Sequence, residues 1–171
     1  MTAASAPGQF ILDPARSTVA IRHKTIWGLV TVNGTFTSVS GEGKLDADGT
    51  AAGVINVRAA SVDTKNTKRD NHLRSDEFFA AERYPVIKFD VLAAEQGTDG
   101  TVRVDGRLTV RDVTQPLTIT ATLASAEPAG VTLVTQFDVD RAAFGITWNQ
   151  LGMIRGHATV SATLRFTRNG G

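Results

Sequence analysis

The sequence has no cysteine among its 171 residues. Disulfide bonds, thiolate metal sites and a cysteine nucleophile are therefore excluded, although the absence does not identify the redox compartment. The chain also lacks an excess of charge of either sign, since 18 basic and 17 acidic residues leave a formal net charge of +1. A surface this balanced has no strong field for nucleic acid or an acidic partner, and we expect no nucleic-acid binding.

Long apolar runs are missing as well. No segment approaches the roughly 18 consecutive apolar residues that a membrane-spanning helix needs, so we expect no stable membrane insertion. The N-terminal residues Met1 to Gln9 contain neither the basic segment nor the apolar segment of a secretory signal. From this we expect a cytoplasmic protein.

Alternation of apolar and polar residues is the dominant pattern in the rest of the chain. The segment Pro116 to Ser125, for example, alternates leucine or isoleucine with threonine, and this period of two predicts a β-strand. Short turns separate about eight such segments, so we assign residues 9–168 to one all-β domain that follows a disordered or frayed segment at 1–8. Because a long antiparallel sheet hides its edges by closing, we predict a single extended antiparallel β-barrel of about eight strands.

Residues 66–80 interrupt this pattern with a crowd of charges and two phenylalanines. The segment lacks β-branched residues apart from Thr67, which favours a short helical insert. Asn66 or Thr67 is a suitable N-cap, and Asp70 falls in the first turn. Pro85 then ends the insert before the next strand.

The interior of such a barrel is either packed solid or hollow, and periodicity does not distinguish the two. Small residues at expected inward positions leave volume: Ala59, Gly106, Ala121, Ala158 and Ala162. Bulky apolar residues are concentrated in the insert and in a late connection: Phe78, Phe79, Phe144, Ile146, Trp148, Leu151, Met153 and Ile154. They are expected either to plug the barrel ends as ordinary core or to line a tunnel, and composition alone favours the plug.

No motif makes a strong case for catalysis or for a metal. Asp70 and His72 could relay protons, but such groups near a chain crossing more often satisfy one another or cap the backbone. His23, His72 and His157 lack the spacing of a metal site, and no serine has the setting of a hydrolase nucleophile. We therefore expect no enzymatic activity, no catalytic residue, no metal and no cofactor.

A series of short motifs resembles one known family over about Phe10 to Phe166. In chain order they are Leu12-Asp13-Pro14-x-x-Ser17, Val32-x-Gly34-x-Phe36, Ser61-Val62-x-Thr64, Arg69-Asp70-x-His72-Leu73-Arg74-Ser75-x-x-Phe78-Phe79, Tyr84-Pro85-x-Ile87-x-Phe89, Gly106-x-Leu108-Thr109-Val110-x-x-Val113-Thr114-x-Pro116 and Asp140-Arg141-x-x-Phe144-Gly145. Together they resemble the YceI-like family of polyisoprenoid-binding proteins. Two features differ from the family pattern. Many relatives carry a secretory leader and work in the periplasm, whereas Met1 to Gln9 do not have the features of such a leader. Arg16 stands where relatives often have histidine.

The resemblance implies a lipocalin-like barrel whose apolar tunnel holds a long chain, and it shifts the expectation from plug to tunnel. The expected function is non-catalytic binding and carriage or storage of a lipid such as a polyprenyl chain or an isoprenoid quinone. We expect the tunnel wall to include Phe36, Phe78, Phe79, Phe89, Leu108, Phe144, Ile146, Trp148 and Met153. We expect four polar residues to structure the rim or to meet a polar head group: Arg69, Asp70, His72 and Arg141.

Two other functions remain open at this point. One is a lipid-modifying hydrolase or isomerase that uses His72 and Asp70. The other is a solid-cored structural stress module without a ligand. The sequence leaves the oligomeric state open, and a homodimer is compatible with it.

Overall fold

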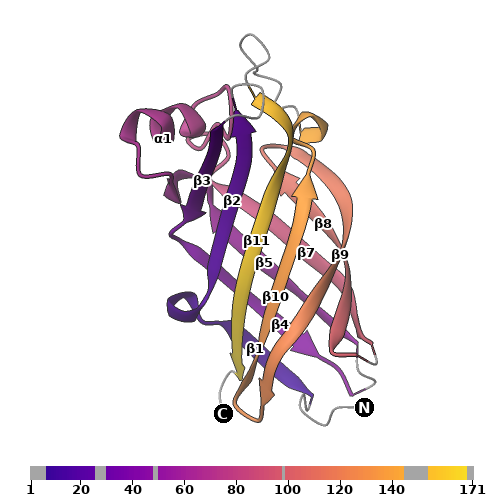
Figure 1. The fold of residues 1–171 in the computed structure, drawn as a ribbon. Helices are drawn as coiled ribbons and strands as arrows, with labels where there is room; N and C mark the ends of the chain where they lie inside the picture. The colour runs from indigo at the N-terminus through magenta and orange to yellow at the C-terminus, as the bar shows by residue number, and fades with distance from the viewer. Residues whose placement is uncertain (1–6, 26–29, 48–49, 98, 145–153, 169–171) are drawn as a thin grey trace.

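The computed structural model describes residues 7–25, 30–47, 50–97, 99–144 and 154–168. Within them, eleven strands form one antiparallel sheet. The strands are β1 (Gly8–Leu12), β2 (Thr18–Thr25), β3 (Val30–Phe36), β4 (Val39–Leu45), β5 (Ala51–Arg58), β6 (Val62–Asp63), β7 (Val86–Gln96), β8 (Thr101–Val110), β9 (Val113–Glu127), β10 (Gly130–Val139) and β11 (Ile154–Arg168). Figure 1 shows the long strands running side by side around a common axis.

The sheet closes because its first and last strands pair. Phe10 of β1 lies opposite Arg168 of β11, and Leu12 lies opposite Phe166. β2 continues along the same β11, while β3 and β4 follow one another beside β2 and β1. β5 and β6 likewise share the next place in the sheet. The eleven segments therefore occupy eight positions of a closed antiparallel barrel, which confirms the predicted fold.

The turn between β1 and β2 shows why one long strand is divided into two. Asp13 accepts a hydrogen bond from the backbone N–H of Ala15 at 3.0 Å, and Pro14 begins the short 3₁₀-helix η1 (Pro14–Arg16). Proline has no N–H to donate and its φ is fixed, so it suits the first position of such a turn. The strand resumes at Thr18 on the other side of this outward turn.

The predicted helical insert is α1 (Thr67–Arg74), which lies against the outside of one end of the barrel in Figure 1. Asn66 is its N-cap, because its side chain accepts from the backbone N–H of Arg69 at 3.0 Å. The helix ends earlier than the predicted range of 66–80: the backbone N–H of Ser75 bonds to the His72 carbonyl, and a series of turns then leads to Pro85. The chain re-enters the sheet at Val86.

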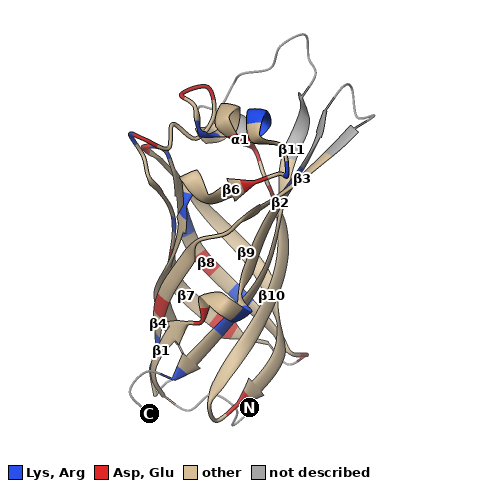
Figure 2. Cartoon of the chain, turned by 90° about the vertical axis from the view of Figure 1, so that its left-hand side faces the viewer, with Lys and Arg blue, Asp and Glu red and all other residues tan. Residues whose placement is uncertain are grey.

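Alternation within the strands sorts side chains between the interior and the outer surface. On β10, for example, Val131, Leu133 and Phe137 face the interior, whereas Val134 between them is exposed. The outer surface carries mixed charge: Figure 2 shows acidic and basic residues interspersed over the strands visible in that view. None of the described helices has the length and apolar composition needed to cross a membrane.

Candidate ligand-binding cavity

The barrel encloses an apolar cavity of about 370 Å³. Inward-facing side chains of the long strands line it, among them Ile21 of β2, Phe89 of β7 and Leu133 of β10. Pockets for small molecules start at roughly 300 Å³, so the cavity is of ligand-binding size. The interior is therefore not the solid core that the plug interpretation requires.

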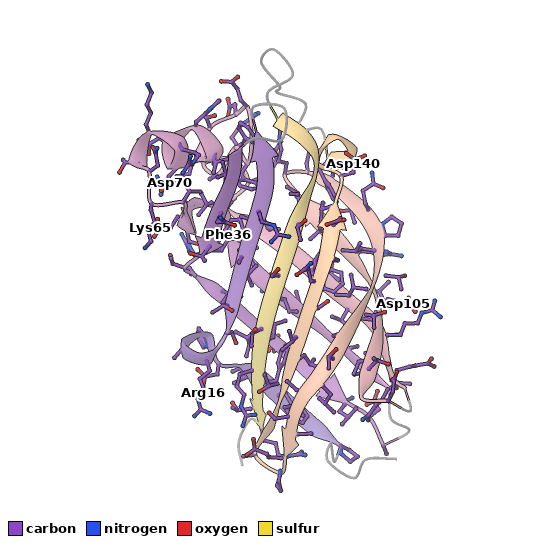
Figure 3. The ribbon with its side chains drawn as sticks, viewed as in Figure 1. Arg16, Phe36, Lys65, Asp70, Asp105 and Asp140 are labelled. Carbon is purple, nitrogen blue, oxygen red and sulfur yellow. The ribbon has the colours of Figure 1, made fainter. Side chains whose placement is uncertain are left out.

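Aromatic and aliphatic side chains close the cavity at the end near α1. Leu73, Phe78 and Phe79 come from α1 and the turns after it, and each is no more than 8% exposed. The rings of Phe36 and Phe79 meet edge to face, with centroids 5.7 Å apart, a geometry that aromatic pairs favour. In Figure 3, Phe36 lies beneath the α1 segment that carries Asp70. Phe144 also lines this region and is buried.

Small residues widen the middle of the barrel along one wall. Thr135 of β10 is the pairing partner of Ala121 on β9 and of Ala162 on β11. All three line the cavity and are buried. The hydroxyl of Thr135 donates to the carbonyl of Thr120 at 3.0 Å, so this buried polar group is satisfied by the wall itself. Three adjacent strands thus present little more than methyl-sized groups to the cavity.

Most of the predicted wall residues face this cavity. Phe36, Phe78, Phe79, Phe89, Leu108 and Phe144 all line it. Ile146, Trp148 and Met153 lie outside the described residues. The lining is a geometric result, and a ligand-binding role for these residues stays a prediction.

One of the small inward positions does not leave the volume that the sequence suggested. A Cβ placed on Gly106 would lie 2.6 Å from Cζ of Phe89, so the ring of Phe89 already fills the space above the glycine. The expectation that Gly106 contributes empty volume is therefore wrong. Ala59 is also packed rather than open, since it is completely buried in the core. Ala121, Ala158 and Ala162 do line the cavity.

A buried polar network fixes α1 to the barrel. Asp70 is 6% exposed, and one of its oxygens accepts from both the backbone N–H and the hydroxyl of Thr64, at 2.8 and 2.6 Å. Arg69 donates to the Thr64 hydroxyl oxygen at 2.9 Å and to the Thr64 carbonyl at 3.2 Å. Thr64 also lines the cavity, and sequence reasoning missed this role. Its position two residues before the N-cap Asn66 was the available signal.

The other predicted polar residues occupy different surroundings. His72 Nε2 lies 3.3 Å from Glu77 Oε1, and its ring meets Phe78 edge to face with centroids 5.1 Å apart. Residues two apart on a helix do not share a face, so α1 does not direct the His72 and Asp70 side chains toward each other. Arg141 begins the 3₁₀-helix η3 (Arg141–Phe144), and its side chain lies outside the described part of the structure.

Arg74 is a further residue of this region that the sequence did not single out for a role. Its guanidinium donates to the carbonyls of Ala60 and Val62 at 2.9 and 3.3 Å. It therefore ties the end of α1 to β6 and to the residues just before that strand. Among the described residues, no group of three or more His, Cys, Asp or Glu side chains could hold a metal ion.

A closed antiparallel barrel around an apolar cavity defines the class of small ligand-holding barrels. The family model for the YceI-like domain matches residues 10–166. The chain therefore belongs to the YceI-like family, as its motifs predicted.

Among curated relatives, a UPF0312 protein of Vibrio vulnificus is 30% identical over 120 residues, covering 68% of this chain and 64% of its own length. A UPF0312 protein of Photorhabdus laumondii is 37% identical over 92 residues, covering 53% of this chain and 47% of its own length. The chain thus matches less than two thirds of these relatives' length.

Solved structures share the fold at low sequence identity. BcnA of Burkholderia cenocepacia has a TM-score of 0.81 at 21% identity, covering 90% of this chain and 98% of the other. A polyisoprenoid-binding domain from Saccharophagus degradans, described as implicated in plant cell wall breakdown, has a TM-score of 0.76 at 17% identity, covering 93% and 98%. Both likenesses support the barrel architecture.

Proposed function

We propose that the protein binds a lipid with a long apolar chain in the barrel cavity and carries or stores it without catalysing a reaction. The bound lipid is a polyisoprenoid, an isoprenoid quinone or a similar molecule. The observation that carries the proposal is the 370 Å³ cavity with its apolar lining, which runs from the α1 end to the β4–β5 hairpin. Family membership and the polyisoprenoid-binding relative from Saccharophagus degradans add support.

The energetics suit an unbranched or methyl-branched hydrocarbon. Each buried methylene contributes roughly 0.8 kcal/mol, so a five-carbon isoprene unit contributes about 3–4 kcal/mol before losses. Ordering and immobilising a flexible chain offsets much of this gain. Two to four isoprene units, as an order of magnitude, therefore suffice for useful affinity. Because apolar attraction is non-directional, the shape and length of the cavity set the selectivity.

Extraction of the purified protein with organic solvent, followed by mass spectrometry, tests the proposal. We expect the extract to contain an apolar lipid in stoichiometric amount relative to the protein. Native mass spectrometry should show the intact protein heavier by the mass of the same lipid. Protein stripped of lipid should take up a fluorescent prenyl analogue saturably. Repeated absence of both a co-purified lipid and saturable uptake would refute the proposal.

Incubation of the purified, lipid-bound protein distinguishes carriage from catalysis. If the protein were a lipid-modifying enzyme that uses His72 and Asp70, a bound ester or diphosphate would turn over, and His72→Ala would abolish turnover while leaving binding intact. We expect instead that the bound lipid is recovered unchanged after long incubation. The predicted cytoplasmic location does not enter this argument and stays a prediction.

A further inference from the structure

The two ends of the cavity differ in how the wall is exposed. Near α1, the lining residues Thr64, Leu73, Phe78, Phe79 and Phe144 are all buried. At the opposite end, near the last residues of β4 and β7, the inward-facing lining residues Leu45, Ala51 and Val102 are only half-buried and Gln96 is exposed. Among the described residues, the cavity wall therefore reaches solvent at the hairpin end.

Two glycines stand opposite each other on the inner face of the wall at this end. Gly43 of β4 and Gly53 of β5 are direct pairing partners, and both line the cavity. Gly53 in turn pairs with Val91 of β7, another lining residue, so this face of the hairpin is the inner face. Neither glycine carries a side chain that could narrow the barrel here. Gly43 leaves open space, whereas a Cβ on Gly53 would clash with the carbonyl oxygen of Glu42, so Gly53 allows β4 to approach closely. The neighbouring lining residues are small or aliphatic, among them Leu45 and Ala51, in contrast to the aromatic end near α1.

The α1 end is also held shut by polar bonds. Asp70 and Arg69 both bond to Thr64, and Arg74 bonds to the carbonyls of Ala60 and Val62. Entry beside α1 would require breaking several of these bonds at once, and Asp70 is buried. Entry at the hairpin end breaks none of them.

We propose that the mouth of the cavity lies between the β4–β5 and β7–β8 hairpins. The ligand is a single-chain amphiphile that enters tail first, so that its terminal methyl group rests against Phe36 and Phe79. Its polar head stays at the mouth beside Gln96, an exposed polar residue that follows the inward alternation of β7 through Ala94. This orientation rests on the proposed function, because it assigns the direction of the same ligand.

Paramagnetic broadening tests the orientation directly. Isotope-labelled protein is titrated with two spin-labelled stearic acids, one with the nitroxide near the carboxyl group and one with it near the terminal methyl. The first should broaden the amide signals of Gly43 and Gly53, and the second those of Leu73 and Phe79. If the carboxyl-end label instead broadened Leu73 and Phe79, and the methyl-end label broadened Gly43 and Gly53, the orientation would be overturned while lipid binding stayed established. Absence of saturable binding by either probe would instead count against the proposed function itself.

A substitution at the mouth gives a kinetic test. A Cβ on Gly43 would have only the Ala52 carbonyl oxygen within 4 Å, at 3.4 Å, so Gly43→Leu is accommodated and narrows the opening. Uptake and release of a fluorescent prenyl analogue should both slow by about tenfold, with a much smaller change in Kd, because a narrower mouth raises the barrier in both directions. Ser40→Leu on the exposed face of the same strand is the control and should leave both rates unchanged. Unchanged rates in folded Gly43→Leu would overturn the proposed mouth.

Discussion

Filling the widened middle of the barrel should weaken lipid binding while stabilising the empty protein. Ala121 is buried, faces the cavity and stands beside Thr135, so Ala121→Phe places about six additional carbons in the space that the ligand needs. At roughly 0.8 kcal/mol per displaced methylene, the upper limit of the loss is about 5 kcal/mol. A flexible ligand can shift along the cavity and recover part of this.

We therefore expect a net loss of about 2–3 kcal/mol, which corresponds to a Kd raised on the order of 30- to 150-fold. The free energy of unfolding of the lipid-free protein should change in the opposite direction. A ring that enters an empty apolar space gains contacts that the cavity lining lacks, so a gain of about 1 kcal/mol is expected.

Two measurements on delipidated protein check this pair of effects: titration with a fluorescent prenyl analogue and equilibrium unfolding in urea. Thr122→Phe is the matched control, because Thr122 is the next residue on β9 and is exposed. It should change neither quantity appreciably. If Ala121→Phe instead lost about 1–3 kcal/mol of stability, as overpacking of a filled core does, and bound the analogue normally, the hollow-barrel reasoning would be refuted.

Three further predictions follow from individual contacts. Leu108→Lys puts an ammonium group on the apolar cavity wall and should abolish uptake of the prenyl analogue, because an unpaired charge there is costly; normal uptake would contradict the inward placement of Leu108. Asp70→Ala leaves the buried N–H of Thr64 without its acceptor and should cost about 1–3 kcal/mol in urea unfolding, whereas Asp70→Asn keeps an accepting oxygen and should cost less. Hydrogen bonds from the Lys65 backbone N–H and ammonium hold the pKa of Asp63 below its usual value. The stability that Asp63 contributes is therefore present above the usual carboxyl pKa and is lost as the pH falls through the lowered one. Asp63→Asn should destabilise at pH near 7, and equal unfolding curves for both proteins at that pH would contradict the assignment.

Local sequence patterns predicted most of the fold because each acts over a few residues. Alternation of period two marks the strands whatever they pair with, and Asn66 caps α1 through a contact only three residues away. Closure of the barrel followed from the need to hide sheet edges.

The interior was harder to predict because it depends on which residues face one another across the barrel. Periodicity places Phe89 and Gly106 on inward faces but does not reveal that the ring of one covers the other. The bonds from Thr64 to Asp70 likewise depend on how the helix returns to the barrel. Ala121, Thr135 and Ala162 come together only through the pairing register of β9, β10 and β11, which no local pattern in the sequence specifies.

The pairing of β1 with β11 has a consequence for how the protein is made. Phe10 and Arg168 stand opposite each other, so this ladder joins segments from the two extremes of the domain. Contacts between residues so far apart in sequence form late, and they make folding slow. During synthesis, β1 must wait for its β11 partner until the final strand leaves the ribosome, with an unpaired strand edge exposed to neighbouring chains in the meantime. Production at lower temperature or with chaperones present should therefore raise the soluble yield more than added lipid does.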